Sequence, residues 1–264
     1  MSVKVLVLRA PGINCEVETA HAFARQGAEP ELVHVRRLLE RPELLDQFRV
    51  FVVPGGFAYG DDLAAGRVLA HQLRTHVGQR LVQFIDRGGF ALGICNGFQA
   101  LIKLGLLPRT GAGGLVQEAT LVHNDSNHYE CRWVRLRSEA SRCVFLPKGL
   151  VLEMPAAHGE GKYVPASPAL HQVLSSEGFV ALRYVRLAAG GGYEPAGGRF
   201  PQNPNGALDD VAGLTDVTGR VLGLMPHPDR AYLPHLMPRW QREGLAANGD
   251  GNEVFRLLVA AARG

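Results

Sequence analysis

Two almost unbroken apolar runs constrain the fold of this chain most. "FRVFVVPGG" spans residues 48–56 and "GGFALGIC" spans residues 88–95. Strands of a parallel sheet are covered by helices on both faces, so they read as continuous apolar runs rather than as alternating apolar and polar residues. The two runs therefore predict buried strands of a parallel sheet.

The segments around these runs alternate between strand and helix patterns. "KVLVLRA" at 4–10 and "EPELVHV" at 29–35 are rich in Val and Leu and predict two further strands. Helical patterns predict helices over 14–27, 61–86 and 96–105, and the first and last of these end at a glycine. This alternation with short links predicts an α/β fold with a mostly parallel central sheet flanked by helices.

Beyond residue 113 the pattern changes. Short strand-like segments follow one another without regular helices between them and predict a small mixed or antiparallel extension; they cover 115–124, 131–138, 150–163 and 179–185. Residues 188–206, rich in Gly, Pro and Asn, predict a mobile loop. A last strand with a polar turn is expected over 220–230 and a closing helix over 252–262. No repeat or low-complexity linker divides the chain, so we expect a single domain over 1–264.

Composition narrows the class of protein. Hydrophobic residues make up 46% and charged residues 20% of the chain, as in ordinary globular proteins. The net charge is only +3 and the basic residues are scattered, which argues against nucleic-acid binding. Four irregularly spaced cysteines predict neither a disulfide framework nor a metal site. The chain starts directly with a strand pattern and has no apolar run long enough to span a membrane, so we expect a cytoplasmic protein.

Cys95 stands where the strand over 88–95 turns into a helix. Gly93 and Gly97 flank it at two residues on either side. Such a turn exposes a nucleophile above the edge of the sheet. The following helix directs its N-terminal dipole at the sulfur, which favours the thiolate. The glycine pair alone leaves a buried, purely structural cysteine equally open.

Two other strand ends carry residues that such a nucleophile needs. Gly55 and Gly56 end one apolar run and can present bare backbone N–H groups, although a plain β-to-α turn has the same sequence. "MPHPDR" ends another and places His227 and Asp229 between or beside prolines, although a solvated loop histidine would also fit. Found together at strand ends of one α/β pattern, these residues predict a Cys–His–acid catalytic site.

Five stretches, in order over nearly the whole chain, resemble a known family. They are "PGGFAYGDD", "GICNGFQ", "PAAHGEGKY", "NPNGALDDVAGL" and "GLMPHPDRAY". The chain resembles the class I (triad) glutamine amidotransferases, and more narrowly the glutaminase subunits of phosphoribosylformylglycinamidine synthase in de novo purine biosynthesis. The resemblance implies a flavodoxin-like fold and hydrolysis of glutamine to glutamate with transfer of the ammonia.

The resemblance also implies roles for individual residues. Cys95 would attack the glutamine amide to form a thioester, His227 would act as base and then acid, and Asp229 stands where the family has glutamate. Other residues implied in oxyanion or substrate binding are Gly55, Gly56, Phe57, Asn96 and Gln99, with His158 and Glu160 at an interface or on the ammonia path. We expect the remaining cysteines, Cys15, Cys131 and Cys143, to be structural.

The resemblance further implies partners. The chain has no G-x-x-x-x-G-K-[ST] loop for ATP. ATP and Mg would therefore be used by a separate synthetase subunit, which aminates formylglycinamide ribonucleotide, and a small bridging subunit would join the complex; this chain itself would bind no cofactor. Two alternatives remain: another Cys–His–acid hydrolase or peptidase of this architecture, or a catalytically impaired regulatory subunit, which only Asp229 favours.

Overall fold

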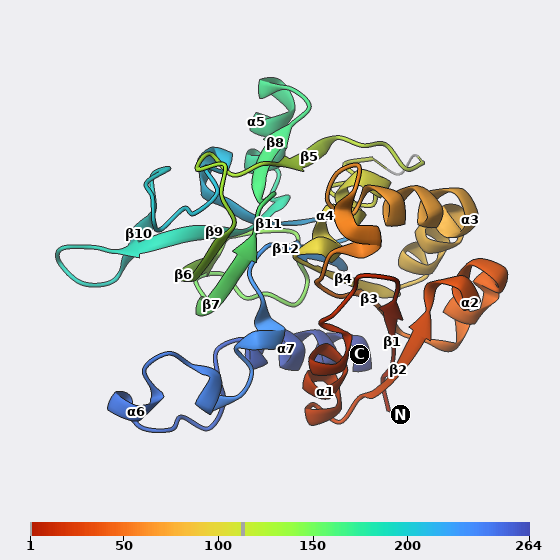
Figure 1. Cartoon of the computed structure of the whole chain (residues 1–264), viewed down its shortest axis with the longest axis horizontal. Coiled ribbons are helices and arrows are strands. Elements are labelled where there is room, and N and C mark those ends of the chain that lie inside the picture. The colour runs from red at the N-terminus through yellow and green to blue at the C-terminus, as the bar shows by residue number, and fades with distance from the viewer. Residues whose placement is uncertain (1, 112–113) are drawn as a thin grey trace.

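One ten-stranded sheet runs through the protein (Figure 1). The computed structural model describes residues 2–111 and 114–264. The strand order is β2-β1-β3-β4-β12-β11-β9-β6-β7, with β10 paired to β9. The first five strands are parallel to one another, namely β2 (Glu29–His34), β1 (Lys4–Arg9), β3 (Val50–Val53), β4 (Phe90–Ile94) and β12 (Val221–Leu224). This is the strand order of flavodoxin-like folds, so the predicted α/β class is confirmed.

The other half of the sheet is antiparallel. Its strands are β11 (Val211–Thr215), β9 (Val180–Leu187), β10 (Tyr193–Pro195), β6 (Glu130–Ser138) and β7 (Val151–His158). A separate two-stranded sheet pairs β5 (Ala119–Val122) with β8 (Lys162–Pro165). The predicted mixed extension is therefore present, and it continues the parallel sheet rather than standing beside it.

Helices cover both faces of the parallel half. In Figure 1, α1 (Glu16–Arg25) and α7 (Asn252–Arg263) lie below the strands, and α3 (Arg67–Asp86) and α4 (Asn96–Leu104) lie above them. α2 (Val35–Glu40) flanks β2 at the outer end. Shorter elements are η1 (Pro42–Gln47), η2 (Ala58–Asp61), α5 (Pro168–Ser176), η3 (Leu208–Asp210), η4 (Pro228–Arg230), η5 (Pro234–Leu236) and α6 (Trp240–Glu243).

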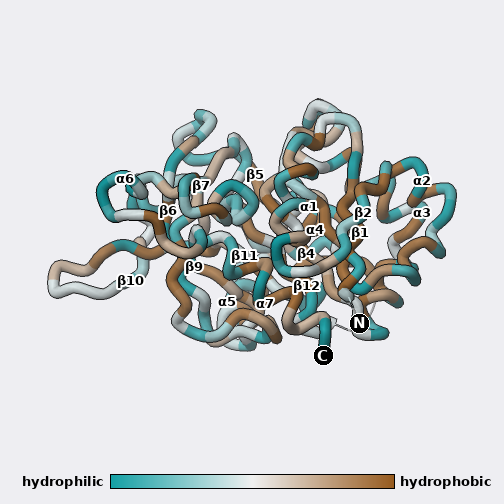
Figure 2. Tube along the Cα trace, turned by 90° about the horizontal axis from the view of Figure 1, so that it is seen from below, coloured by the Kyte–Doolittle hydropathy of each residue, from teal (hydrophilic) through white to brown (hydrophobic). Residues whose placement is uncertain are grey.

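The hydrophobic core lies between the strands and these helices. Every residue of β3, β4 and β12 is buried, as their continuous apolar sequences predict. Phe23 of α1 meets Phe255 of α7 edge to face, with ring centroids 5.0 Å apart. Figure 2 shows hydrophilic stretches on the outer turns beside α2 and α3, and the N and C termini close together. Among the described helices, none is long and apolar enough to cross a membrane.

Three sequence predictions about secondary structure were wrong. The helix expected over 61–86 begins only at Arg67, because Gly66 takes a left-handed φ of +70° and packs against the backbone of Ala100. The segment beyond residue 113 does contain a helix, α5, whose start is marked by a hydrogen bond from the Leu170 N–H to the Ser167 side chain. The expected loop over 188–206 contains β10, which forms a hairpin with β9.

The extension also differs in detail from its predicted strands. Residues 150–163 form two strands in different sheets, since β7 ends at His158 and β8 starts at Lys162. β11 and α2 were not predicted at all. The strand β11, "VAGLT", is short, and it is identified by its pairing with β12 on one side and β9 on the other.

Candidate active site

Cys95 lies at the sharp turn between β4 and α4. Its backbone has φ 51° and ψ −107°, a strained conformation for a residue with a side chain. A Cβ on Gly97 would lie 1.8 Å from the carbonyl oxygen of Val53, so only glycine lets α4 start this close to β3. The thiol is 5% exposed and donates to the carbonyl oxygen of Ala157 at 3.6 Å. The turn thus has the geometry of a nucleophile elbow.

His227 and Asp229 follow β12, the strand next to β4. Because parallel strands end at the same edge of the sheet, this places them beside Cys95. His227 Nδ1 lies 3.2 Å from Asp229 Oδ1, and both side chains are buried. The shorter aspartate therefore still reaches the imidazole. Its other oxygen, Oδ2, is buried and has no hydrogen-bond partner within the described ranges.

The charge state of His227 follows from these neighbours. Burial works to lower its pKa, but the charges of Asp229 and Cys95, the hydrogen bond to Asp229 and the nearby Cys15 sulfur outweigh it, so the pKa is raised well above the usual value. This favours the imidazolium form that a thiolate nucleophile requires. Across the part of the chain that is described, no hydrogen bond joins Cys95 to His227.

The glycine turn after β3 lies against the histidine. A Cβ on Gly55 would sit 2.6 Å from His227 Cε1, and one on Gly56, whose φ is +145°, would sit 2.6 Å from the carbonyl oxygen of Gly12. The N–H of Phe57 donates to that same Gly12 oxygen at 2.8 Å. The Phe57 amide is thus occupied by a hydrogen bond within the protein.

Asn96 and Gln99 tie the elbow to the surrounding loops. Asn96 is the first residue of α4, so its N–H has no partner within the helix. Its side chain accepts from Ala58 N at 2.9 Å and donates to Asp61 Oδ1 at 3.0 Å and to Gln99 Oε1 at 2.9 Å. Gln99 in turn donates to the carbonyl oxygen of Glu160 at 2.5 Å. Both side chains are fixed before any substrate enters.

The hydrogen bonds around His158 define its tautomer. Asn124 Oδ1 accepts from Gly161 N at 3.0 Å, so this atom is an oxygen and also accepts from His158 Nδ1 at 3.2 Å. The proton is therefore on Nδ1, and Nε2 is a bare acceptor. Nε2 is buried without a partner among the residues described. Burial is the main cause that lowers the pKa of His158 to about 4, so the ring is neutral at physiological pH.

This buried neutral histidine makes stability depend on pH. Its pKa is about 4 in the folded protein against an ordinary value of 6.5. The stabilising contribution is therefore complete above about pH 6.5 and is lost as pH falls towards 4. We expect the free energy of unfolding to fall in both proteins when the pH is lowered from about 7 to about 4. The fall should be larger in the wild type than in His158→Gln, by on the order of 3 kcal/mol. Urea unfolding at both pH values measures this difference.

A matched control is the exposed histidine His235, whose replacement by glutamine should follow the wild-type curve. Equal pH dependence of the wild type and His158→Gln would contradict the neutral, buried state of His158.

Glu160 stands at the mouth of the site. Its carboxylate accepts from Ala65 N at 3.2 Å and lies 4.0 Å from Lys103 Nζ, which also donates to the carbonyl oxygen of Ala65 at 2.8 Å. Burial lowers the pKa of Lys103, although the charges of Glu160 and Asp61 oppose it. This ion pair links α4 to the turn between β7 and β8.

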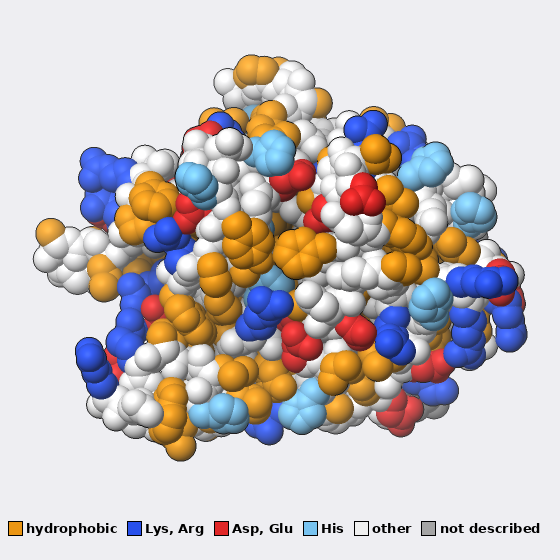
Figure 3. Space-filling view, viewed as in Figure 1, with side chains coloured by type: hydrophobic (Ala, Val, Ile, Leu, Met, Phe, Trp, Pro, Cys, Tyr) orange, Lys and Arg blue, Asp and Glu red, His pale blue; other side chains and the backbone are white. Residues whose placement is uncertain are grey.

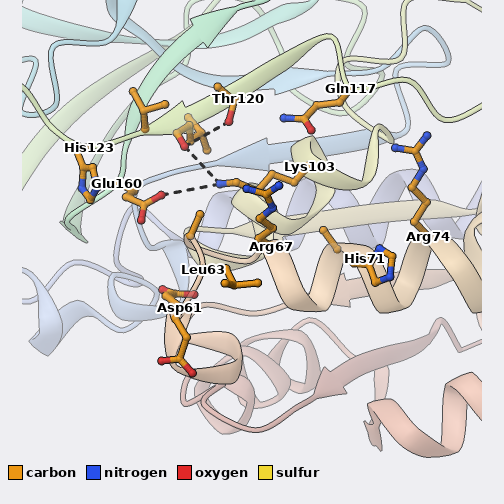
Figure 4. Close-up of a pocket in the computed structure, with 15 residues that line it drawn as sticks. Asp61, Leu63, Arg67, His71, Arg74, Lys103, Gln117, Thr120, His123 and Glu160 are labelled. Carbon is orange, nitrogen blue, oxygen red and sulfur yellow. Dashed lines mark hydrogen bonds and ion pairs between the residues drawn. The ribbon is translucent and has the colours of Figure 1, made fainter.

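Two cavities meet at this mouth. A pocket of about 160 Å³ contains the thiol; its lining includes Gly56, Phe57, Cys95, Gln99, Tyr129, His158 and Glu160. A groove of about 740 Å³ adjoins it and shares Asp61, His123 and Glu160. Figure 4 shows this groove, with Arg67, His71 and Arg74 along α3 on one side and Gln117, Thr120 and His123 on the other. The small pocket admits only a small molecule.

Sequence reasoning missed two residues at the site, Cys15 and Tyr129. Cys15, expected to be structural, has its sulfur within 4.8 Å of a His227 ring nitrogen and an Asp229 oxygen. Tyr129 lines the pocket beside Phe57. Asp61, which the sequence offers as a helix cap or a residue that positions the substrate, accepts hydrogen bonds from Gly66 N and Asn96 Nδ2. No motif signalled Tyr129, since it reaches the pocket only through the antiparallel half of the sheet.

The face of the molecule drawn in Figure 3 carries no single dominant charge patch. On the face drawn in Figure 3, Lys and Arg side chains gather at the two ends of the molecule, interspersed with acidic ones. Hydrophobic side chains lie nearer the centre of the same face. This arrangement agrees with the scattered basic residues of the sequence and with the small net charge of +3.

Comparison with known proteins identifies the family. A family model described as a CobB/CobQ-like glutamine amidotransferase domain matches residues 2–260. PurQ subunits of phosphoribosylformylglycinamidine synthase are similar: that of Dehalococcoides mccartyi is 44% identical, covering 99% of this chain and 98% of the relative. That of Methanococcus maripaludis is 41% identical, and the match covers 94% of this chain and 90% of the relative. A chain in the structure of PurLQS from Thermotoga maritima matches with a TM-score of 0.71 and 29% identity, covering 98% and 99%. The chain therefore belongs to the CobB/CobQ-like glutamine amidotransferase family and groups with its PurQ members.

Proposed function

We propose that this chain is the glutaminase subunit of a phosphoribosylformylglycinamidine synthase. It hydrolyses glutamine to glutamate and passes the ammonia to a synthetase subunit, which converts formylglycinamide ribonucleotide to formylglycinamidine ribonucleotide. The observation that carries the chemistry is the thiol of Cys95 on its strained elbow, inside a small pocket and beside the buried His227–Asp229 pair. The names of the similar PurQ proteins supply the acceptor.

The first half of the reaction forms a thioester. The sulfur of Cys95 attacks the side-chain carbonyl carbon of glutamine, and the backbone N–H groups of Gly56 and Asn96 stabilise the oxyanion. His227 gives its proton to the amide nitrogen as the C–N bond breaks, and ammonia leaves. Asp229 holds the imidazole and stabilises its positive charge.

The second half regenerates the enzyme. His227 takes a proton from water, the hydroxide attacks the thioester carbonyl, and the C–S bond breaks to release glutamate. Gln99 is rigidly held and helps to orient the substrate. His158 contributes the bare acceptor Nε2 in the pocket wall, which suits an N–H group of glutamine or of the departing ammonia.

The groove beside α3 is the proposed exit and docking face. It opens from the thiol pocket at Glu160 and carries Arg67 and Arg74, which form no ion pair within the described part of the chain (Figure 4). A synthetase seated there would cover the path of ammonia. We infer that this synthetase supplies the ATP and Mg site, that a small bridging subunit completes the complex, and that the assembly works in the cytoplasm.

The whole chain acts as one unit in this proposal. A continuous sheet joins the parallel half, which carries Cys95 and His227, to the antiparallel half, which carries His158 and the pocket wall. This continuity supports a single domain over residues 1–264. A peptidase is a weaker candidate because the pocket around the thiol, of about 160 Å³, suits a small substrate group such as the glutamine side chain.

The shorter acid is open to a direct test. Asp229→Asn keeps the size of the side chain but removes the charge, so we expect kcat for glutamate release to fall about 10²- to 10⁴-fold. Asp229→Glu should bring no gain, because the aspartate already reaches His227 and the site is buried. Both variants are assayed by glutamate release with the synthetase present. A large gain in Asp229→Glu would instead support the impaired regulatory subunit.

Coupling is the test of the function itself. We expect little glutamate release by the isolated chain, since its thiol donates to Ala157 and not to His227. Release should rise when a PurQ-dependent synthetase, formylglycinamide ribonucleotide and ATP are added together, with one amidine formed per glutamate. Replacing Cys131, an exposed thiol, by serine is the matched control and should change nothing. Full activity of the isolated chain on glutamine would contradict the coupling, and no release in any mixture would contradict the proposed function.

A further inference from the structure

Cys15 is brought to the active site by its backbone. It immediately precedes α1, is completely buried, and its N–H donates to the carbonyl oxygen of Gly55 at 3.3 Å. The neighbouring Ile13 pairs with Gly56 in a single antiparallel bridge. The loop before α1 therefore rests on the glycine turn that lies against the catalytic histidine.

The sulfur of Cys15 lies close to the imidazole of His227 and the carboxylate of Asp229. Its Sγ, a ring nitrogen of His227 and a carboxylate oxygen of Asp229 all lie within 4.8 Å of one another. A Cβ on Gly55 would lie 3.3 Å from this sulfur, 2.6 Å from His227 Cε1 and 3.4 Å from His227 Nδ1. Because Gly55 has no side chain, nothing from this residue separates the sulfur from the imidazole.

Arg230 is a further neighbour of the Cys15 sulfur. Its Nη2 donates to Cys15 Sγ at 3.0 Å, and it follows Asp229 directly in the chain. Cys15 in turn donates to Asn14 Oδ1 at 3.3 Å. A sulfur that only filled space would need no such polar partners. The hydrogen bond from Arg230 instead fixes the sulfur at a defined place beside the histidine.

We propose that Cys15 is a positioning residue for the glutaminase reaction: its sulfur holds the His227 ring against Asp229 and stabilises the imidazolium. This inference rests on the proposed function, because it assigns His227 the role of base. Cys15 does not touch the substrate, and it acts through the histidine. His227 thereby lies between two cysteines with different tasks, Cys95 as nucleophile and Cys15 as support.

The electrostatics agree with this geometry. Burial raises the pKa of the Cys15 thiol, which stays protonated at neutral pH although the nearby His227 works to lower that pKa. Contact with the sulfur is one of the causes that raise the pKa of His227. The other charged or titratable groups that act on His227 or respond to it are Asp229, Cys95, Tyr129 and His158. Removing the sulfur should therefore weaken the imidazolium form of His227, whose positive charge favours attack by the Cys95 sulfur.

The test measures the reactivity of Cys95 against pH. The full-length protein is treated with iodoacetamide, and alkylation of the Cys95 peptide is followed by mass spectrometry. We expect Cys15→Ala to move the pH of half-maximal alkylation upward by about one unit. In the coupled assay the same variant should lose about tenfold in kcat with KM unchanged. Cys15→Ser, which keeps a polar atom, should show the same changes at roughly half the size.

Cys143→Ala is the matched control, since Cys143 is also a buried thiol but lies outside the site. It should lower the melting temperature without moving the alkylation profile. The proposal is overturned if Cys15→Ala changes only the melting temperature, as Cys143→Ala does. If Cys15→Ala does not fold, Cys15→Ser decides, and an unshifted profile overturns the proposal. Failure of the wild type to release glutamate under any condition would contradict the proposed function instead, because the alkylation profile is read without glutamine.

Discussion

Cys95→Ala is expected to abolish glutamate release, with a fall of about 10⁴-fold or more in kcat. The thioester cannot form without the sulfur, and no second thiol is found among the described residues that line the pocket. Since the alanine side chain keeps the Cβ that the strained turn already accommodates, the fold should persist. Glutamate release by the coupled complex, with circular dichroism of the variant, measures both points.

The control for this experiment is ammonia added from outside. A complex that contains Cys95→Ala should still make the amidine when ammonium chloride replaces glutamine, because only the supply of ammonia is lost. Residual glutamine-dependent activity near the wild-type level would rule out Cys95 as the nucleophile.

Gly97→Ala is expected to destabilise the protein by about 3 kcal/mol and to inactivate it. The added Cβ would lie 1.8 Å from the carbonyl oxygen of Val53, so α4 must move away from β3. That movement would also displace Asn96 and the thiol, and a misplacement of about 1 Å can cost about 10²-fold in rate. Urea unfolding gives the loss of stability, and alkylation of Cys95 reports the state of the elbow.

Gly190→Ala is the matched control for this substitution. Gly190 has open space around the position of a Cβ and no left-handed backbone angle. Its replacement should change the free energy of unfolding by less than about 0.5 kcal/mol. Equal stability of Gly97→Ala and Gly190→Ala would mean that the elbow is not held by close packing.

The parallel half of the fold could be predicted because its signals are local. Continuous apolar runs such as 48–56 report burial on both faces, and a glycine on each side of Cys95 reports a crowded turn. The strands that precede Cys95 and His227 end at the same edge of the sheet, so the sequence alone predicts that these two residues lie together.

The antiparallel half was harder to predict because its elements depend on distant partners. β11 is a five-residue strand that exists only between β9 and β12, and β10 interrupts a glycine-rich segment by pairing with β9. The role of Cys15 was missed for a related reason. Its partners, Arg230 and His227, lie more than two hundred residues away, so no local pattern connects them.

The position of β12 has a consequence for synthesis of the protein on the ribosome. β12 inserts beside β4, more than one hundred residues after it in the chain, and His227 follows it. A nascent chain that has already emerged as far as Cys95 therefore carries the nucleophile without its base. Since contacts so distant in sequence form only after the later segment exists, the thiol gains its partner only near the end of translation. Ammonia production is thereby withheld from every nascent chain that has not yet reached His227.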